Sequence, residues 1–312
     1  MSPVEEQTVE LAAPDSGRRR VFVYGATGDG PGRAALLIPG LSLPNRPRPV
    51  AGYVESIARA LAELGLVVVR GEPRWSRPGG TPLQELDWLT EVDDAAATLG
   101  WLKQQPFVEP SQLFIVGVSL GGVAAPLVAR EAGGVAGIAS WAATARPWVK
   151  YAVATLRSQL LWRGAPAHVV AQAVAASEWW HRQLRDTDCS AAELLEQNPE
   201  IAGLEVTREG CMGRPTEFWR QLCQLDSAAA YRELGCRVCT VRGSADFAAH
   251  AADQRSIVEA AEAAGLEVEA IELEGLDHLL RPAESARQAF RGRIDGASQY
   301  DRLAAVLARW MG

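Results

Sequence analysis

The stretch LFIVGVSLGG, residues 113–122, decides the fold of this chain. Its first residues are apolar and β-branched, which predicts a buried strand, and the small apolar residues 122–130 predict a helix. A strand that turns directly into a helix holds the residue at the turn, Ser119, in a strained, positive-φ conformation. Gly117 and Gly121 stand two positions to either side, where larger side chains would collide. The pattern predicts an exposed serine nucleophile above a helix N-terminus.

Length and composition limit the class of protein. The 312 residues, 48% of them hydrophobic, suffice for one large α/β domain with an insertion. The net charge is −7, and the longest basic run is Arg18-Arg19-Arg20. Both facts argue against nucleic acid and against an anionic membrane surface as partners. The composition leaves the oligomeric state open.

The N-terminus and the cysteines bear on compartment and cofactors. Residues 1–10 are acidic and polar, unlike a signal peptide, and no apolar run has the length of a membrane span, so we expect a cytoplasmic protein. The five cysteines are an odd number for a disulfide framework. Cys236 and Cys239 have C-x-x-C spacing, but they lie in a predicted strand, where such positions face opposite sides. We expect no metal ion and no cofactor.

Apolar strands alternate with helices along the first 145 residues, which predicts a mostly parallel, doubly wound α/β sheet of about eight strands in all. Two edge strands are expected first, at 7–12 and 20–24. The following strands are predicted at 34–38, 66–70, 113–118 and 135–143, and the intervening helices at 50–64 and 88–104.

The alternation breaks at Arg146-Pro147. Up to about residue 225 the pattern is helical without an obvious strand, and the sheet resumes with strands at 237–242 and 267–273. We therefore predict a core made of 1–145 and 226–312 and a helical lid at 146–225. Half of the ten tryptophans fall in this insertion. Three of them are candidates for a substrate pocket, and the alternative is that they fill the core of the lid: Trp148, Trp179 and Trp180.

A serine nucleophile needs a base to take its proton. The chain has four histidines, of which His168 and His181 lie in the predicted lid. His278 follows the strand at 267–273, and catalytic groups of open α/β sheets gather at such carboxyl ends. His250 is the weaker candidate. We therefore assign the base to His278.

The base in turn needs a carboxylate to orient it. Asp246 lies just past the carboxyl end of the strand at 237–242, in the sequence Gly-Ser-Ala-Asp. Asp253 is seven residues further on, in a predicted helix, and Asp277 adjoins His278, so it is badly placed to reach the ring of its neighbour. Asp246 is therefore the candidate.

The order Ser119, Asp246, His278 resembles that of the α/β-hydrolase family. The G-x-S-x-G turn, the late Gly-Ser-Ala-Asp and the Asp-His in the last quarter all match, and the insertion lies where that family usually carries its lid. The resemblance covers nearly the whole chain. It implies a serine hydrolase of esterase or thioesterase type that acts on a small-molecule acyl substrate.

The resemblance also implies an oxyanion hole made of two backbone N–H groups. One belongs to Leu120, after the nucleophile, and the other to Leu41, in the sequence Ile38-Pro39-Gly40-Leu41 that ends an early strand. Pro39 stands where the family usually has histidine, which leaves the hydrogen bonding inside this loop unexplained.

Other functions compete with ester hydrolysis. The same triad serves an acyltransferase or a thioesterase, and a non-catalytic binding protein on this fold is a third possibility. The Gly-rich segment 25–32 resembles the phosphate turn of dinucleotide oxidoreductases, but a strand follows it instead of a helix, so we interpret it as a hairpin turn.

For a hydrolase, the tryptophan-rich lid predicts a largely apolar pocket that prefers hydrophobic or aromatic acyl groups to anionic ones.

Overall fold

The computed structural model describes residues 4–12, 18–25, 30–43, 50–76, 80–292 and 296–312, and within these residues eight strands form one sheet. Strand β2 runs antiparallel to both of its neighbours, and all other neighbouring pairs are parallel. The predicted mostly parallel sheet is confirmed. Its order is β1 (Glu6–Ala12), β2 (Arg18–Tyr24), β4 (Val67–Gly71), β3 (Gly32–Ile38), β5 (Val108–Val118), β6 (Gly137–Trp141), β9 (Arg237–Gly243), β10 (Val268–Leu273).

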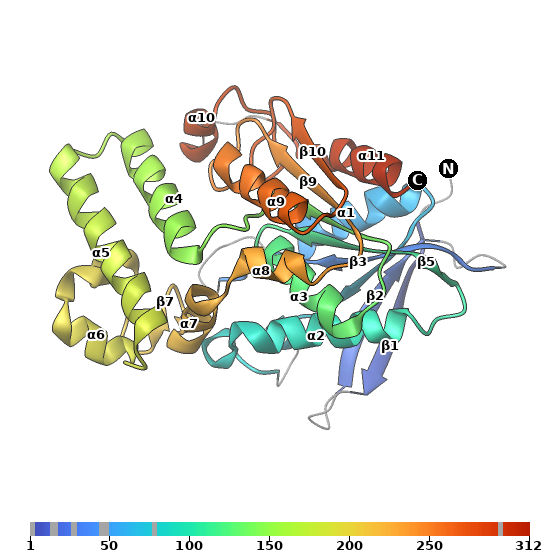
Figure 1. The fold of residues 1–312 in the computed structure, drawn as a ribbon, viewed down its shortest axis with the longest axis horizontal. Helices are drawn as coiled ribbons and strands as arrows, with labels where there is room; N and C mark the ends of the chain where they lie inside the picture. The colour runs from blue at the N-terminus through green and yellow to red at the C-terminus, as the bar shows by residue number, and fades with distance from the viewer. Residues whose placement is uncertain (1–3, 13–17, 26–29, 44–49, 77–79, 293–295) are drawn as a thin grey trace.

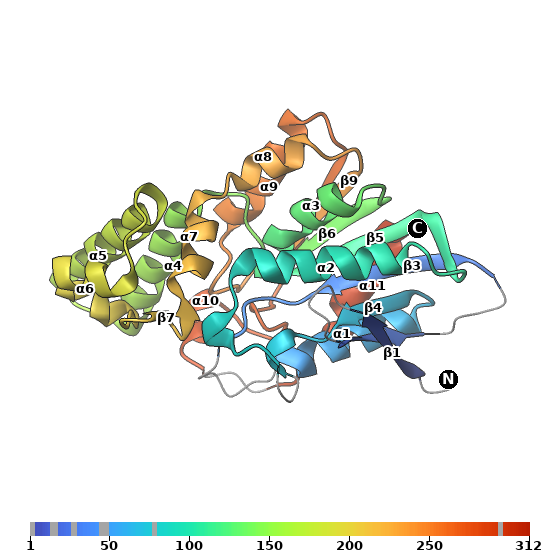
Figure 2. The same cartoon turned by 90° about the horizontal axis from the view of Figure 1, so that it is seen from below.

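Helices cover both faces of this sheet (Figures 1 and 2). Successive residues of a strand point to opposite faces, so Leu36 packs in the apolar cluster with α2 (Trp88–Leu102) and α3 (Leu120–Ala132). Its neighbour Leu37 packs in the cluster with α1 (Val50–Glu63) and α11 (Tyr300–Met311) on the other face. Burial on both faces explains why these strands are continuously apolar.

A helical insertion separates β6 from β9, as the sequence predicts. Figure 1 shows α4 to α7 to one side of the sheet, and α8 lies in contact with α3 and with α9 (Ala251–Ala263). Helix α4 also contacts α10 (Ala286–Phe290). The inserted helices are α4 (Trp148–Arg163), α5 (Ala167–Asp186), α6 (Ala191–Gln197), the 3-10 helix η3 (Pro199–Leu204), α7 (Thr216–Gln224) and α8 (Ser227–Arg232).

The insertion is not purely helical, although its sequence shows no obvious strand and it adds none to the eight-stranded sheet. Strands β7 (Gly210–Cys211) and β8 (Arg214–Pro215) pair antiparallel. The two residues between them, Met212 and Gly213, have φ of 53° and 76°, which suits a tight two-residue hairpin. Strands of two residues are too short to show a periodic pattern.

Two interpretations of the N-terminal strands were also wrong. Of the two predicted edge strands, β1 lies at an edge of the sheet and β2 does not, because β2 is also paired with β4. The segment between β2 and β3 does not close a hairpin, since β4 lies between these two strands in the sheet. Residues 26–29 of that segment are outside the described residues. Neighbours along the chain need not be neighbours in a sheet.

Candidate active site

Ser119 occupies the turn between β5 and α3. Its φ of 54° and ψ of −116° lie outside the regions that L-residues favour, as the motif predicts. The turn is held by hydrogen bonds: the Ser119 N–H donates to the carbonyl of Trp141 at 2.7 Å, and the Gly122 N–H donates to the Ser119 carbonyl at 2.9 Å. Since α3 begins at Leu120, the first N–H groups of this helix have no partner within the helix.

The glycines around Ser119 are required by close backbone contacts. A Cβ on Gly117 would lie 2.4 Å from the Gly121 carbonyl oxygen. A Cβ on Gly121 would lie 2.3 Å from the carbonyl oxygen of Ile38 and 2.5 Å from that of Pro39. The loop after β3 therefore lies directly against the first turn of α3.

Replacement of Gly121 by alanine should destabilise the protein, because the atoms that its Cβ would meet belong to the backbone. We expect a loss of about 1–3 kcal/mol or more in the free energy of unfolding, measured by denaturant titration. The control is Gly100→Ala in α2, whose added Cβ meets no neighbouring atom within 4 Å outside its own helix. That change should stabilise by up to about 1 kcal/mol. Equal stability of the two variants would show that the turn does not need glycine.

His278 and Asp246 form a close pair in the loops that follow β10 and β9. The Nδ1 atom of His278 lies 3.0 Å from each carboxylate oxygen of Asp246, whose side chain is fully buried. One of these oxygens also accepts the backbone N–H groups of Ala248 and Ala249, at 2.7 and 2.8 Å. The carboxylate is thereby fixed against the ring.

The environment of His278 affects its basicity. Burial by itself would lower the pKa of this imidazole, but the charge and hydrogen bond of Asp246, with the charge of Asp277, outweigh that effect and raise the pKa above its usual value. With the proton on Nδ1 directed at Asp246, Nε2 is the atom left to accept a proton.

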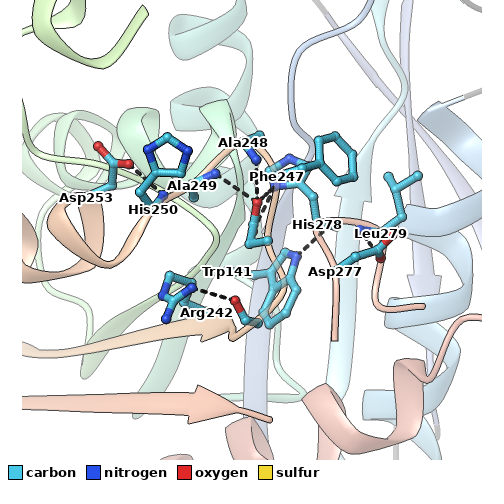
Figure 3. A network of polar contacts seen from close by, with 12 residues as sticks. Trp141, Arg242, Phe247, Ala248, Ala249, His250, Asp253, Asp277, His278 and Leu279 are labelled. Carbon is cyan, nitrogen blue, oxygen red and sulfur yellow. Dashed lines mark hydrogen bonds and ion pairs between the residues drawn. The ribbon is translucent and has the colours of Figure 1, made fainter. Parts of the chain in front are cut away.

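Trp141 connects the two parts of the site. This residue ends β6 and is 1% exposed. Its carbonyl accepts the Ser119 N–H, and its indole Nε1–H donates to the carbonyl of His278 at 3.1 Å (Figure 3). Ser119 and the loop that carries His278 are therefore tied to one buried residue. No motif in the sequence singles out Trp141, because its role depends on strands that are distant along the chain.

The remaining acidic candidates have other partners. The Asp277 carboxylate is fully buried and accepts the N–H groups of Leu279 and Arg281, and it forms an ion pair with the Arg281 guanidinium at 2.7 Å. It therefore orders the loop around His278. Asp253, also fully buried, accepts the N–H of His250 at 2.7 Å and pairs with Arg146. Of the three aspartates, Asp246 is the one whose carboxylate contacts the His278 ring.

The other histidines have different surroundings. His181 is buried within α5, where its Nδ1 lies 2.7 Å from the Ser177 carbonyl, and burial lowers its pKa to about 4. His168 is exposed, and His250 precedes α9 with its ring 6.0 Å from that of Trp162.

The loop after β3 is supported by a residue that sequence reasoning missed. The Gly40 N–H donates to the hydroxyl of Tyr53, on α1, at 2.8 Å. A Cβ on Gly40 would lie 3.1 Å from the Ser119 Cβ and 3.2 Å from the Tyr53 hydroxyl, so both border the same small space. Burial raises the pKa of Tyr53 to about 12, which keeps the phenol neutral. This hydrogen bond joins the loop that contains Pro39 to α1.

If the amide of Leu41, the residue after Gly40, is an oxyanion donor, removal of the Tyr53 hydroxyl should impair it. For Tyr53→Phe we expect a loss in kcat of about tenfold or more with KM little changed, since one misplaced donor acts mainly on the transition state. Binding of a boronic acid, which imitates the tetrahedral intermediate, should weaken in parallel. Tyr231→Phe is the matched control, because the buried Tyr231 hydroxyl, on α8, has no hydrogen-bond partner among the described residues. An unchanged kcat in Tyr53→Phe would exclude the role.

The candidate pocket tryptophans differ in their surroundings. Trp180 is 1% exposed and belongs to the apolar cluster that includes Leu184 and Phe218. Trp148 is half-buried, with its ring 5.1 Å from that of Tyr151 and 6.1 Å from that of Trp219. Trp179 is likewise half-buried and packs against the same cluster as Trp180. Their contact with a substrate stays a prediction.

The part of the chain that the structure describes contains neither a candidate metal cluster nor a candidate membrane-spanning helix. There, no group of three or more His, Cys, Asp or Glu side chains is arranged to hold a metal ion. Within the same residues, no helix combines the length and apolar character needed to cross a membrane. The five cysteines are free thiols, and burial raises the pKa of four of them: Cys211, Cys223, Cys236 and Cys239.

Comparison with solved structures establishes the fold class. The chain is similar to DcsB in complex with its substrate analogue (TM-score 0.59, 16% identity, 98% of both chains covered). It is also similar to Est1E from Butyrivibrio proteoclasticus (TM-score 0.57, 11% identity, 97% of both chains). A third similar structure is the esterase domain of a Rhodothermus marinus protein (TM-score 0.54, 19% identity, 99% of this chain and 100% of that one).

These likenesses, together with the strand order, give the chain the α/β-hydrolase fold. At identities below 20% they concern the fold alone. No family model matches the sequence, and no curated protein matches it either.

Proposed function

We propose that this protein is a serine hydrolase that cleaves ester-type acyl substrates through a covalent acyl-enzyme. One observation carries the proposal: Nδ1 of His278 lies 3.0 Å from both oxygens of the buried Asp246, while Trp141 ties the His278 loop to Ser119. A nucleophile on a strained turn, a base and an orienting carboxylate are the parts that acyl transfer needs.

In the first half of the proposed reaction, Ser119 Oγ attacks the acyl carbon while Nε2 of His278 takes its proton. The oxyanion that forms accepts hydrogen bonds from the N–H groups of Leu41 and Leu120, each of which contributes about 3 kcal/mol. The intermediate then collapses: the bond to the leaving group breaks, and His278 returns the proton to that group.

In the second half, water attacks the acyl carbon of the Ser119 ester and gives its proton to His278. The bond to Oγ breaks, the acid is released, and His278 reprotonates Ser119. An acyltransferase would use another nucleophile in place of water, and a thioesterase would start from a thioester. Both would use the same acyl-enzyme.

We also infer that the inserted helices α4 to α7, which lie in the predicted lid of residues 146–225, act as a lid over this site. Helix α4 is joined to the loop that carries Asp246: the Thr155 hydroxyl donates to the Ala248 carbonyl at 3.1 Å, and Gln159 Nε2 donates to the Phe247 carbonyl at 3.4 Å. The Phe247 ring in turn lies 5.6 Å from that of His278. Movement of α4 would therefore reach the catalytic pair.

A panel of matched esters, thioesters and amides tests the reaction class. For a hydrolase, burst kinetics should show one equivalent of leaving group released before steady-state acid production. Faster turnover of thioesters, or product formation only with an added alcohol or amine, would move the assignment to thioesterase or acyltransferase. No turnover and no burst with any substrate would favour a binding protein.

A further inference from the structure

A cleft that is open to solvent lies beside the proposed oxyanion hole. Gly40 from the loop after β3 and Leu120 from the first turn of α3 both line it. The cleft then extends along α2, where Trp88, Val92 and Ala95 contribute to its wall. A carbonyl held by the amides of Leu41 and Leu120 would thus place one of its two substituents at this cleft.

The order of the strands decides which substituent that is. Ser119 follows β5, and the cleft adjoins the ends of β3 and β4 on one side of it. Asp246 and His278 follow β9 and β10 on the opposite side. Because the base must hand its proton to the departing atom, the leaving group has to lie on the His278 side. The acyl group remains on Ser119 and points the other way.

The lining of the cleft determines which acyl groups fit. Trp75, Trp88, Leu86 and Val92 offer aromatic and aliphatic surface. The carboxylates in the wall are paired with arginines: Asp94 with Arg19 and Arg74, Glu72 with Arg20, and Glu91 with Arg214. A charged acyl group would have to be desolvated beside ion pairs that are already satisfied, which is unfavourable. An uncharged, bulky acyl group has no charge to desolvate and so avoids this penalty.

We propose that this cleft is the acyl-binding subsite, and that it takes uncharged acyl groups with a medium-length aliphatic chain or an aromatic ring. The inference rests on the proposed function, because it needs an acyl group on Ser119. It adds to that function the class of acyl group and the direction in which this group points from Ser119.

A matched pair of substitutions on α2 tests the subsite. Ala95 lines the cleft, whereas Ala97 on the same helix is exposed to solvent. With p-nitrophenyl esters, which keep the leaving group constant, Ala95→Leu should lower kcat/KM for octanoate by about tenfold or more and change that for acetate less than about twofold. Ala97→Leu should change neither. Equal losses for both esters, or none, would overturn the subsite.

A structure of a covalent adduct provides an independent measurement. A fluorophosphonate with an octyl group on phosphorus would place that group in the acyl position once bonded to Ser119. We expect the octyl chain between α2 and α3, against Trp88 and Ala124. A chain directed toward α4 would overturn the subsite and leave the serine hydrolase intact. Failure of the reagent to bond to Ser119 would refute the proposed function, and the subsite with it.

Discussion

Replacement of Ser119 by alanine should lower kcat by several orders of magnitude, about 10⁴-fold or more, and leave the free energy of unfolding nearly unchanged. The reason is chemical: alanine removes the attacking oxygen, whereas the turn depends on backbone hydrogen bonds from Ser119 and Gly122 that alanine retains. Steady-state kinetics and a denaturant titration measure the two quantities separately.

The control for this change is Ser56→Ala, on α1, whose hydroxyl donates only to the carbonyl of Gly52 at 2.9 Å in the same helix. Its kcat should equal that of the unmodified protein. Full turnover in Ser119→Ala would remove the nucleophile from the proposed reaction. A large loss of stability in that variant would show that the hydroxyl also supports the turn.

The second large effect concerns Asp246 and His278, which should act as a unit. Asp246→Asn removes the charge that holds the Nδ1 proton, and His278→Ala removes the base. Each should lower kcat by about 10³-fold or more, and the double variant should lose little beyond the worse single variant. Losses that add independently in the double variant would show that the two residues do not cooperate.

The pH dependence gives a separate test of the same pair. His278 must be neutral to take the proton, so activity requires a pH above its pKa, which Asp246 raises. Asp246→Asn should lower that pKa, and the acid limb of the kcat/KM profile should move to lower pH even as the rate falls. A limb that stays in place would indicate that another group limits the rate at low pH. Asp277, which also raises this pKa, is unchanged in the variant, so part of the upward shift of the pKa should remain.

The sequence allows much of the fold to be predicted because its signals are local. Residues 113–122 carry the strand, the turn and the helix start within one short stretch, and the structure gives Ser119 the positive φ expected there. Asp246 and His278 could be singled out because parallel strands bring their carboxyl ends to one edge of the sheet. That rule does not depend on which strands are neighbours.

Features that depend on distant contacts could not be predicted in the same way. The contacts of Trp141 with Ser119 and His278, and that of Tyr53 with Gly40, join segments that only the folded sheet brings together. The place of β2 beside β4 is a further example, since pairing is set by the whole sheet and not by a turn motif. The short β7–β8 hairpin could not be predicted because strands of two residues each are too short to show an alternating pattern.

The reaction of the protein with a fluorophosphonate, followed by intact mass measurement and peptide mapping, tests the central claim most directly. We predict one adduct per chain, located on Ser119, absent in Ser119→Ala, and formed at least about 10³-fold more slowly in His278→Ala. An intact, folded protein that gains no adduct, or gains it on another residue at an equal rate, would contradict the assignment of Ser119 as a nucleophile activated by His278.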